Sequence, residues 1–137
     1  MIQTHFDSSS VSVPAARRFA LGTLHDVSSQ VVHTVAMIVT ELASNCVRHA
    51  PSSGFAVRID QTAGAVQIEV SDSGGGTLAP RAVRPTDASG RGLQIVKSLA
   101  DAWGVVNAAD GTGKTVWATV LLPEPERHRG GAASRTR

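Results

Sequence analysis

The stretch ADGTGKTVWATV, residues 108–119, decides between two very different folds. Gly113, Lys114 and Thr115 match the end of the phosphate-loop pattern G-x-x-x-x-G-K-[ST], which connects a strand to the helix that follows it. The first glycine of that pattern would fall at position 108, where the chain has Ala108. The residues after Thr115 are β-branched and apolar in alternation, which predicts a strand and not a helix. The stretch is therefore predicted to be a turn that enters a strand, and Lys114 is not expected to bind phosphate.

The rest of the chain divides into helices and strands by its hydrophobic period. Apolar residues recur at spacings of three and four where helices are expected and alternate where strands are expected. The predicted order is a helix over 13–24, a helix from Ser28 or Ser29 to about Ala50, a strand hairpin over 55–59 and 66–70, a helix over 92–100, and strands over 103–108 and 114–122. Residues 2–10 are expected to form a short edge strand or to stay loose. Short turns between consecutive strands favour an α/β two-layer sandwich, with a mostly antiparallel mixed sheet covered on one face by about three helices.

Composition fits one domain over residues 1–123, followed by a disordered, arginine-rich tail over 124–137. The chain has 137 residues and a formal net charge of +2. The tail holds four arginines and two glutamates, so it carries all of that charge, and the nine basic and nine acidic residues of 1–123 cancel. Because the charges of the domain balance, the high pI belongs to the tail and does not indicate a basic face, and no direct contact with nucleic acid is expected.

Cysteine content and hydropathy indicate the compartment. Cys46 is the single cysteine, so there is no internal disulfide, and its apolar helical neighbours predict a small core side chain. The sequence has no signal-peptide pattern and no apolar run long enough to span a bilayer. We therefore expect a cytoplasmic protein without membrane contact.

Polar side chains on the second predicted helix form the first candidate site. Glu41 and Asn45, in ELASNCVRHA (41–50), are four residues apart and share a helix face that Arg48 and His49 continue. Their oxygens suit Mg²⁺, and the carboxylate is a candidate base for a hydroxyl or water. The alternative is a surface Glu–Asn pair on an amphipathic helix.

The segment DSGGG (72–76) ends a predicted strand and forms the second candidate site. Asp72 has the same parity as the apolar residues of that strand, such as Val70, so its carboxylate should face the covered side. A carboxylate there needs a donor, which an exocyclic amine of a ligand could supply. Gly74 and Gly76 would let the backbone approach the ligand closely. The alternative is a simple Asp-Gly turn.

The segment GRGL (90–93) is predicted to open a helix and forms the third candidate site. Backbone N–H groups at a helix start bind phosphate, and Arg91 could add charge-assisted hydrogen bonds. The alternative is a flexible entry into the helix. The long glycine- and proline-rich segment before it, residues 71–92, is expected to be a functional loop.

Together these segments resemble the Bergerat, or GHKL, ATP-binding fold shared by gyrase-type ATPases, sensor histidine kinases and anti-sigma-factor serine kinases. ELASNCVRHA resembles the N box of that family, DSGGG its first glycine box, GRGLQIV its second, and GTGKTVWA its last box. The resemblance runs from about residue 13 to residue 122, and the four boxes keep the family's order and spacing.

The resemblance implies a role for each matched residue, with ATP and Mg²⁺ as the cofactors. Glu41 would be the general base, and Asn45 would bind the Mg²⁺ that bridges the phosphates. Asp72 would accept a hydrogen bond from the adenine amine, and Thr115 would support Asp72 through water. Gly74 and Gly76 would shape the adenine pocket, and residues 77–89 would form the ATP lid. The phosphates and the lid hinge would be served by Gly90, Arg91, Gly92 and Leu93. His49 would either contact phosphate or pack against neighbouring side chains.

Within this family the chain is similar to the anti-sigma-factor serine kinases. Histidine kinases need a phosphoacceptor helical hairpin, and His25 lies too close to Glu41 to leave room for one. Gyrase-like ATPases need a transducer domain, for which we expect no room in this sequence. The resemblance implies transfer of the ATP γ-phosphate to a serine of a STAS-class antagonist, binding of a sigma factor, and a homodimer. Two alternatives stay open: a module that binds ATP or its partner without transfer, and a fragment that only hydrolyses ATP.

Overall fold

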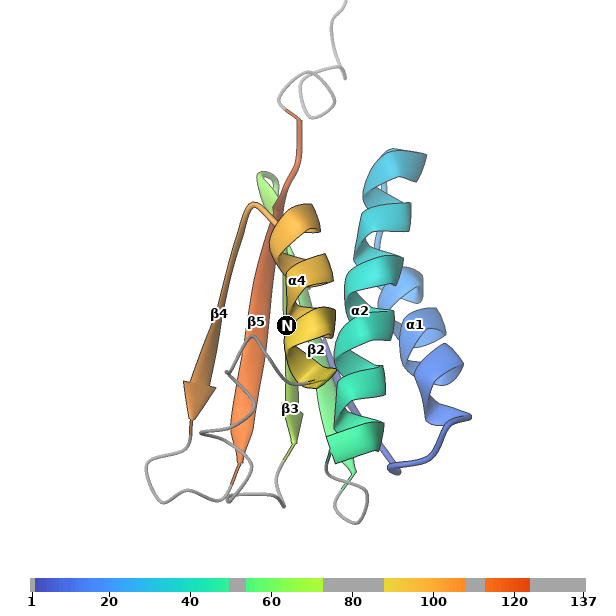
Figure 1. Ribbon diagram of the computed structural model, residues 1–137. Helices are drawn as coiled ribbons and strands as arrows, with labels where there is room; N and C mark the ends of the chain where they lie inside the picture. Colours follow the sequence, from blue (N-terminus) through green and yellow to red (C-terminus); the bar gives the residue numbers. More distant parts are fainter. Residues whose placement is uncertain (1, 50–53, 73–87, 108–112, 124–137) are drawn as a thin grey trace, which may run out of the picture.

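The structure is a computed structural model that describes residues 2–49, 54–72, 88–107 and 113–123 (Figure 1). Gly74, Gly76, most of the expected lid and the expected tail over 124–137 lie outside these residues. The elements are β1 (Ile2–Phe6), α1 (Ser12–Gly22), α2 (Ser29–His49), β2 (Phe55–Gln61), β3 (Ala65–Asp72), α4 (Ala88–Leu99), β4 (Ala102–Asn107) and β5 (Lys114–Leu121).

Within the described part of the chain, five strands form one sheet in the order β1-β2-β3-β5-β4. All four pairings between these strands are antiparallel, so the expected antiparallel architecture is confirmed, and no parallel pair occurs among the described strands. The segment expected either to form an edge strand or to stay loose is β1, which pairs with β2 alone. The predicted hairpin is β2–β3, and the strand predicted after Gly113 is β5.

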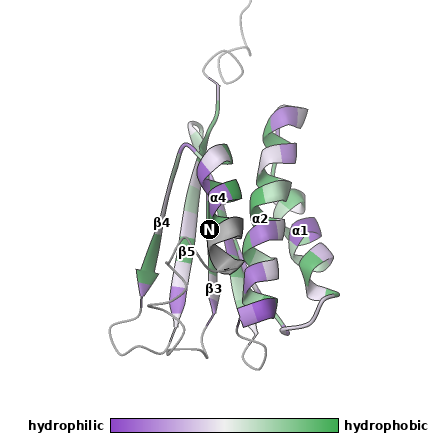
Figure 2. Cartoon of the chain, in the orientation of Figure 1, coloured by the Kyte–Doolittle hydropathy of each residue, from purple (hydrophilic) through white to green (hydrophobic). Residues whose placement is uncertain are grey.

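The helices α1, α2 and α4 lie on one face of the sheet, which gives the expected two layers (Figure 1). The central helix is α2, which packs against both other helices and over β3 and β5. Figure 2 shows hydrophilic and hydrophobic residues alternating around α1 and α2, as expected for helices with one buried side. The part of the chain that the structure describes contains no helix long and apolar enough to cross a membrane.

Local sequence explains where α2 begins and which side it buries. The Ser28 hydroxyl accepts a hydrogen bond from the Val31 backbone N–H at 3.2 Å, which satisfies one of the free donors of the first turn. Apolar residues then recur every three or four positions and form the buried stripe of the helix: Val31, Val35, Ile38, Val39, Leu42 and Cys46. This stripe packs onto the sheet, and the polar residues Glu41 and Asn45 lie beside it on the same helix.

Strand alternation positions the functional end of the sheet. In β3 the buried residues are Val66, Ile68, Val70 and Asp72, and each residue between them is partly exposed. The register places Asp72 beside Phe55 of β2 and beside Lys114 of β5. A carboxylate and an ammonium therefore lie on the helix-covered face, where the sheet meets the C-terminal half of α2.

Gly54 immediately precedes β2. Its replacement by alanine is expected to destabilise the fold by about 2 kcal/mol. Its φ is +74°, and a Cβ there would lie 2.7 Å from the Phe6 carbonyl oxygen, a backbone atom. Gly64→Ala is the matched control, because a Cβ at Gly64 meets nothing within 4 Å. Urea unfolding of both variants measures the difference, and equal losses of stability would contradict this account of Gly54.

Candidate functional site

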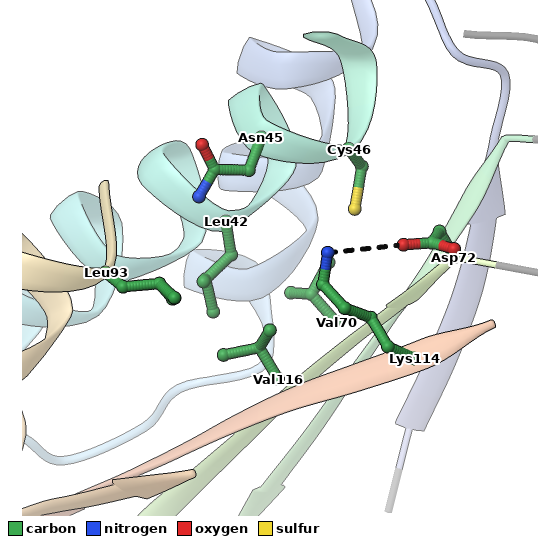
Figure 3. A pocket seen from close by; sticks show the side chains of 8 residues that line it. All are labelled: Leu42, Asn45, Cys46, Val70, Asp72, Leu93, Lys114 and Val116. Atoms are coloured by element: carbon green, nitrogen blue, oxygen red, sulfur yellow. Dashed lines mark ion pairs between the residues drawn. The ribbon is translucent and has the colours of Figure 1, made fainter. Parts of the chain in front are cut away.

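A small cavity lies between the C-terminal half of α2, the helix α4 and the adjoining ends of β3 and β5 (Figure 3). Its volume is about 10 Å³, which is room for about one water molecule. Its lining is apolar apart from a few polar groups and consists of Leu42, Asn45, Cys46, Val70, Asp72, Leu93, Lys114 and Val116. Three residues expected in the nucleotide site from the sequence, Asn45, Asp72 and Leu93, therefore meet at one cavity.

Asp72 and Lys114 are the charged groups among the described residues of the cavity lining. The Lys114 Nζ lies 3.8 Å from the Asp72 Oδ2, and the two side chains are only 11% and 5% exposed. Figure 3 shows the lysine reaching from β5 toward the carboxylate, beneath the sulfur of Cys46. At this separation the two groups form an ion pair, although the distance is longer than a hydrogen bond.

Asn45 contributes the polar group on the helix side of the cavity. Its residue is 7% exposed, and its Oδ1 accepts a hydrogen bond from the Arg48 Nη2. Glu41 lies one helical turn earlier, is partly exposed, and does not line the cavity. Glu41 thus lies outside the cavity, four residues before Asn45 on the same helix.

The expectation that Thr115 supports Asp72 is wrong. Thr115 pairs with Ser71 across β3 and β5, and the two hydroxyl oxygens are 2.6 Å apart. Because side chains alternate along a strand, Thr115 faces the opposite side of the sheet from Asp72. The residue that faces Asp72 is Lys114, which sequence reasoning missed. Lys114 lies two residues before the apolar Val116 and therefore shares its face of the strand, and this spacing is the sequence signal that could have identified Lys114.

The other expected site residues are only partly placed. The helix α4 begins at Ala88, so Gly90 lies within its first turn, Arg91 and Gly92 follow inside the helix, and the side chains of 88–92 are not described. His49 is the last residue of α2, is half-buried, and does not line the cavity. The phosphate contacts expected from these residues therefore stay predictions.

Cys46 lines the cavity with an uncharged thiol. Burial, together with a smaller effect of the nearby Asp72 carboxylate, raises the pKa of its thiol from the ordinary 9.0 to about 12, and the Lys114 ammonium acts in the opposite direction. The thiol is therefore protonated at neutral pH and behaves as a small apolar group, as the sequence predicted.

This pKa shift predicts that the protein loses stability in alkali. The folded thiol keeps its proton up to about pH 12, whereas the unfolded thiol releases its proton above about pH 9, so higher pH favours unfolding. The free energy of unfolding should fall by about 1 kcal/mol between about pH 8 and pH 10 because of Cys46. Urea unfolding of wild type and Cys46→Ala over this range measures the effect. Equal pH dependence in both proteins would contradict it.

The donor set does not form a closed metal site. Within the described ranges, no three histidine, cysteine, aspartate or glutamate residues gather where they could hold a metal ion. Asn45 offers one amide oxygen, which fits Mg²⁺, because this ion commonly takes one or two protein ligands and completes its shell with phosphates and water.

Comparison with known proteins agrees with this arrangement. The family model described as histidine kinase-like ATPase domain matches residues 6–120 of the chain. A search of curated proteins found no match. The matched range holds α1 to β4, all of β5 except its last residue, and every described residue that lines the cavity. The GHKL resemblance is thereby confirmed, and the chain belongs to the histidine kinase-like ATPase domain family.

Proposed function

We propose that this protein binds Mg·ATP in the cavity at the end of β3 and transfers the γ-phosphate to a serine of a STAS-type anti-sigma-factor antagonist. The observation that carries the proposal is the meeting of Asn45 and Asp72 at one buried cavity, with Glu41 one helical turn away. Membership of the ATPase family supports ATP binding and ATP-dependent activity in general. The serine substrate and control of a sigma factor rest on the resemblance of the sequence motifs.

In this proposal the base of ATP lies against the apolar walls and donates its exocyclic amine to the Asp72 carboxylate. Leu42, Val70 and Val116 supply an apolar surface of the kind that purine rings pack against. The buried carboxylate has no N–H to offer, so it favours a base edge that presents a donor. The phosphates then extend toward Asn45 and the start of α4.

The proposed chemistry belongs to Glu41 and Asn45. The Asn45 amide oxygen would hold Mg²⁺, which neutralises phosphate charge when it is bound. Glu41 is partly exposed, so its carboxylate can meet the hydroxyl of a protein substrate and accept its proton. Positioning of the hydroxyl in line with the γ-phosphate supplies most of the rate enhancement in such reactions.

Partner capture tests the proposal. Tagged protein is mixed with bacterial lysate with and without Mg·ATP, and bound proteins are identified by mass spectrometry together with any new phosphoserine. The expected result is one STAS-type protein that gains a single phosphoserine, and one sigma factor in the bound fraction. Purified antagonist without phosphate after incubation with Mg·ATP would contradict kinase activity.

A second candidate function is an ATP-binding regulatory module without phosphate transfer. The position of Glu41 favours it, because this residue does not line the cavity and the proposed general base is therefore not held at the nucleotide site. Such a module would capture its partner in an ATP-dependent manner and leave it unphosphorylated. Steady phosphate release in the absence of any protein substrate would instead indicate an ATP hydrolase.

A further inference from the structure

Among the described residues that line the cavity, Lys114 is the one charged residue that the proposed reaction does not use. It begins β5 directly opposite Asp72 in the register, on the helix-covered face of the sheet. Its side chain runs into the cavity and not outward to the solvent, which is uncommon for a lysine. Strand parity places Lys114 on this covered face, so a charged side chain stands where the neighbouring inward residues of β5 are apolar.

The Lys114 ammonium presents the same chemistry to Asp72 as the amine of a purine base. Both groups are N–H donors, and the lysine directs its donor at the carboxylate oxygen from 3.8 Å. Lysine and base therefore compete for one acceptor.

The size of the cavity leads to the same conclusion. With Lys114 inside, the volume left is about 10 Å³, which holds about one water molecule and no purine. Leu42, Val70 and Val116 belong to the packed core between α2 and the sheet, so they cannot withdraw cheaply. Lys114 has a long, flexible side chain, and turning it out of the cavity is the simplest way to make room.

We propose that Lys114 is an affinity-determining residue that occupies the base pocket in the ligand-free protein and must leave when the base binds. This inference rests on the proposed function, because it takes the cavity as the site of the base. Binding then exchanges a buried ion pair for a hydrogen bond from a neutral amine, which lowers affinity. The pocket therefore binds only ligands whose amine and ring contacts together contribute more free energy than the contacts of the lysine that they replace.

Lys114→Thr tests the inference with two ligands, ATP and adenosine. Calorimetry should show both ligands binding about tenfold more tightly to the variant, a change of about 1.4 kcal/mol. The two gains should be equal, because the lysine competes at the base and adenosine has no phosphates. The ligand-free variant should melt at a lower temperature than wild type, because Asp72 has lost its ion-pair partner. Opposite signs for affinity and stability distinguish competition from a purely structural role.

The matched control is Lys97→Thr, which removes an exposed lysine from the last turn of α4. It makes the same change in net charge and should leave both affinities within about twofold of wild type. The Asp72→Asn background provides a second check. If the two side chains act as a pair, adding Lys114→Thr to Asp72→Asn should change the affinity for either ligand by less than about twofold.

Each other outcome overturns the inference in a recognisable way. Unchanged affinities would show that Lys114 does not compete. Weaker binding of both ligands would make the lysine a base contact, and weaker binding of ATP alone would make it a phosphate contact. If no folded variant binds adenosine or ATP, the proposed function itself is wrong, and the inference falls with it.

Discussion

Glu41→Gln is expected to lower phosphate transfer by at least about 100-fold, because the amide cannot accept the proton of the attacking hydroxyl. ATP affinity should stay close to wild type, since Glu41 does not line the cavity. The measurement is transfer of labelled γ-phosphate to the antagonist, with ATP binding followed by calorimetry on the same preparation. The substitution keeps the size of the side chain and should leave the fold intact.

Glu69→Gln is the control for this experiment. Glu69 lies on β3, on the face of the sheet away from the helices, and its Oε1 pairs with the Arg58 Nη1 at 3.1 Å. The control makes the same change in charge and should transfer phosphate at the wild-type rate. If Glu41→Gln also transfers at that rate, Glu41 is not the base.

Asp72→Asn is expected to weaken ATP binding by about 10- to 100-fold, which is the usual range for a lost hydrogen bond to a charged group. The substitution removes the anionic acceptor and leaves the buried Lys114 without its ion-pair partner, so thermal stability should also fall. Calorimetry with ATP and with adenosine should show losses of similar size, because the change lies at the base.

Asp26→Asn is the matched control for Asp72→Asn. Asp26 is exposed and precedes the first residue of α2, whereas the cavity lies near the end of that helix. Its φ is +55°, a left-handed conformation that asparagine adopts readily. The control should retain wild-type affinity and stability. Wild-type ATP affinity in Asp72→Asn would exclude contact between Asp72 and the base.

Periodicity in the sequence was enough to predict most of the elements. The three-to-four spacing predicted α2, and Ser28 is the residue that caps it. Alternation predicted the β2–β3 hairpin, the strand after Gly113 and the inward orientation of Asp72. These predictions succeed because local period decides which side chains are buried.

Features that depend on contacts distant in the sequence were not predictable in the same way. The order β1-β2-β3-β5-β4 brings β5 beside β3, and no local pattern announces this pairing. The start of α4 lies in a segment without periodicity, and it falls at Ala88, before the glycines expected to open it. The family motif contains a threonine, and matching it to Thr115 led to the wrong residue. The strand parity that correctly predicted an inward Asp72 also predicts that Lys114, and not Thr115, points inward.

The pairing of β3 with β5 also sets the order in which the pocket can appear during synthesis. Asp72 and Lys114 are opposite each other in the sheet but separated by all of α4 and β4 in the chain. Closing so long a loop carries an entropic cost, and the pairing forms only after β5 has left the ribosome. A nascent chain that ends before β5 therefore lacks the wall that Lys114 and Val116 supply, so the cavity cannot be complete until the last strand has been made.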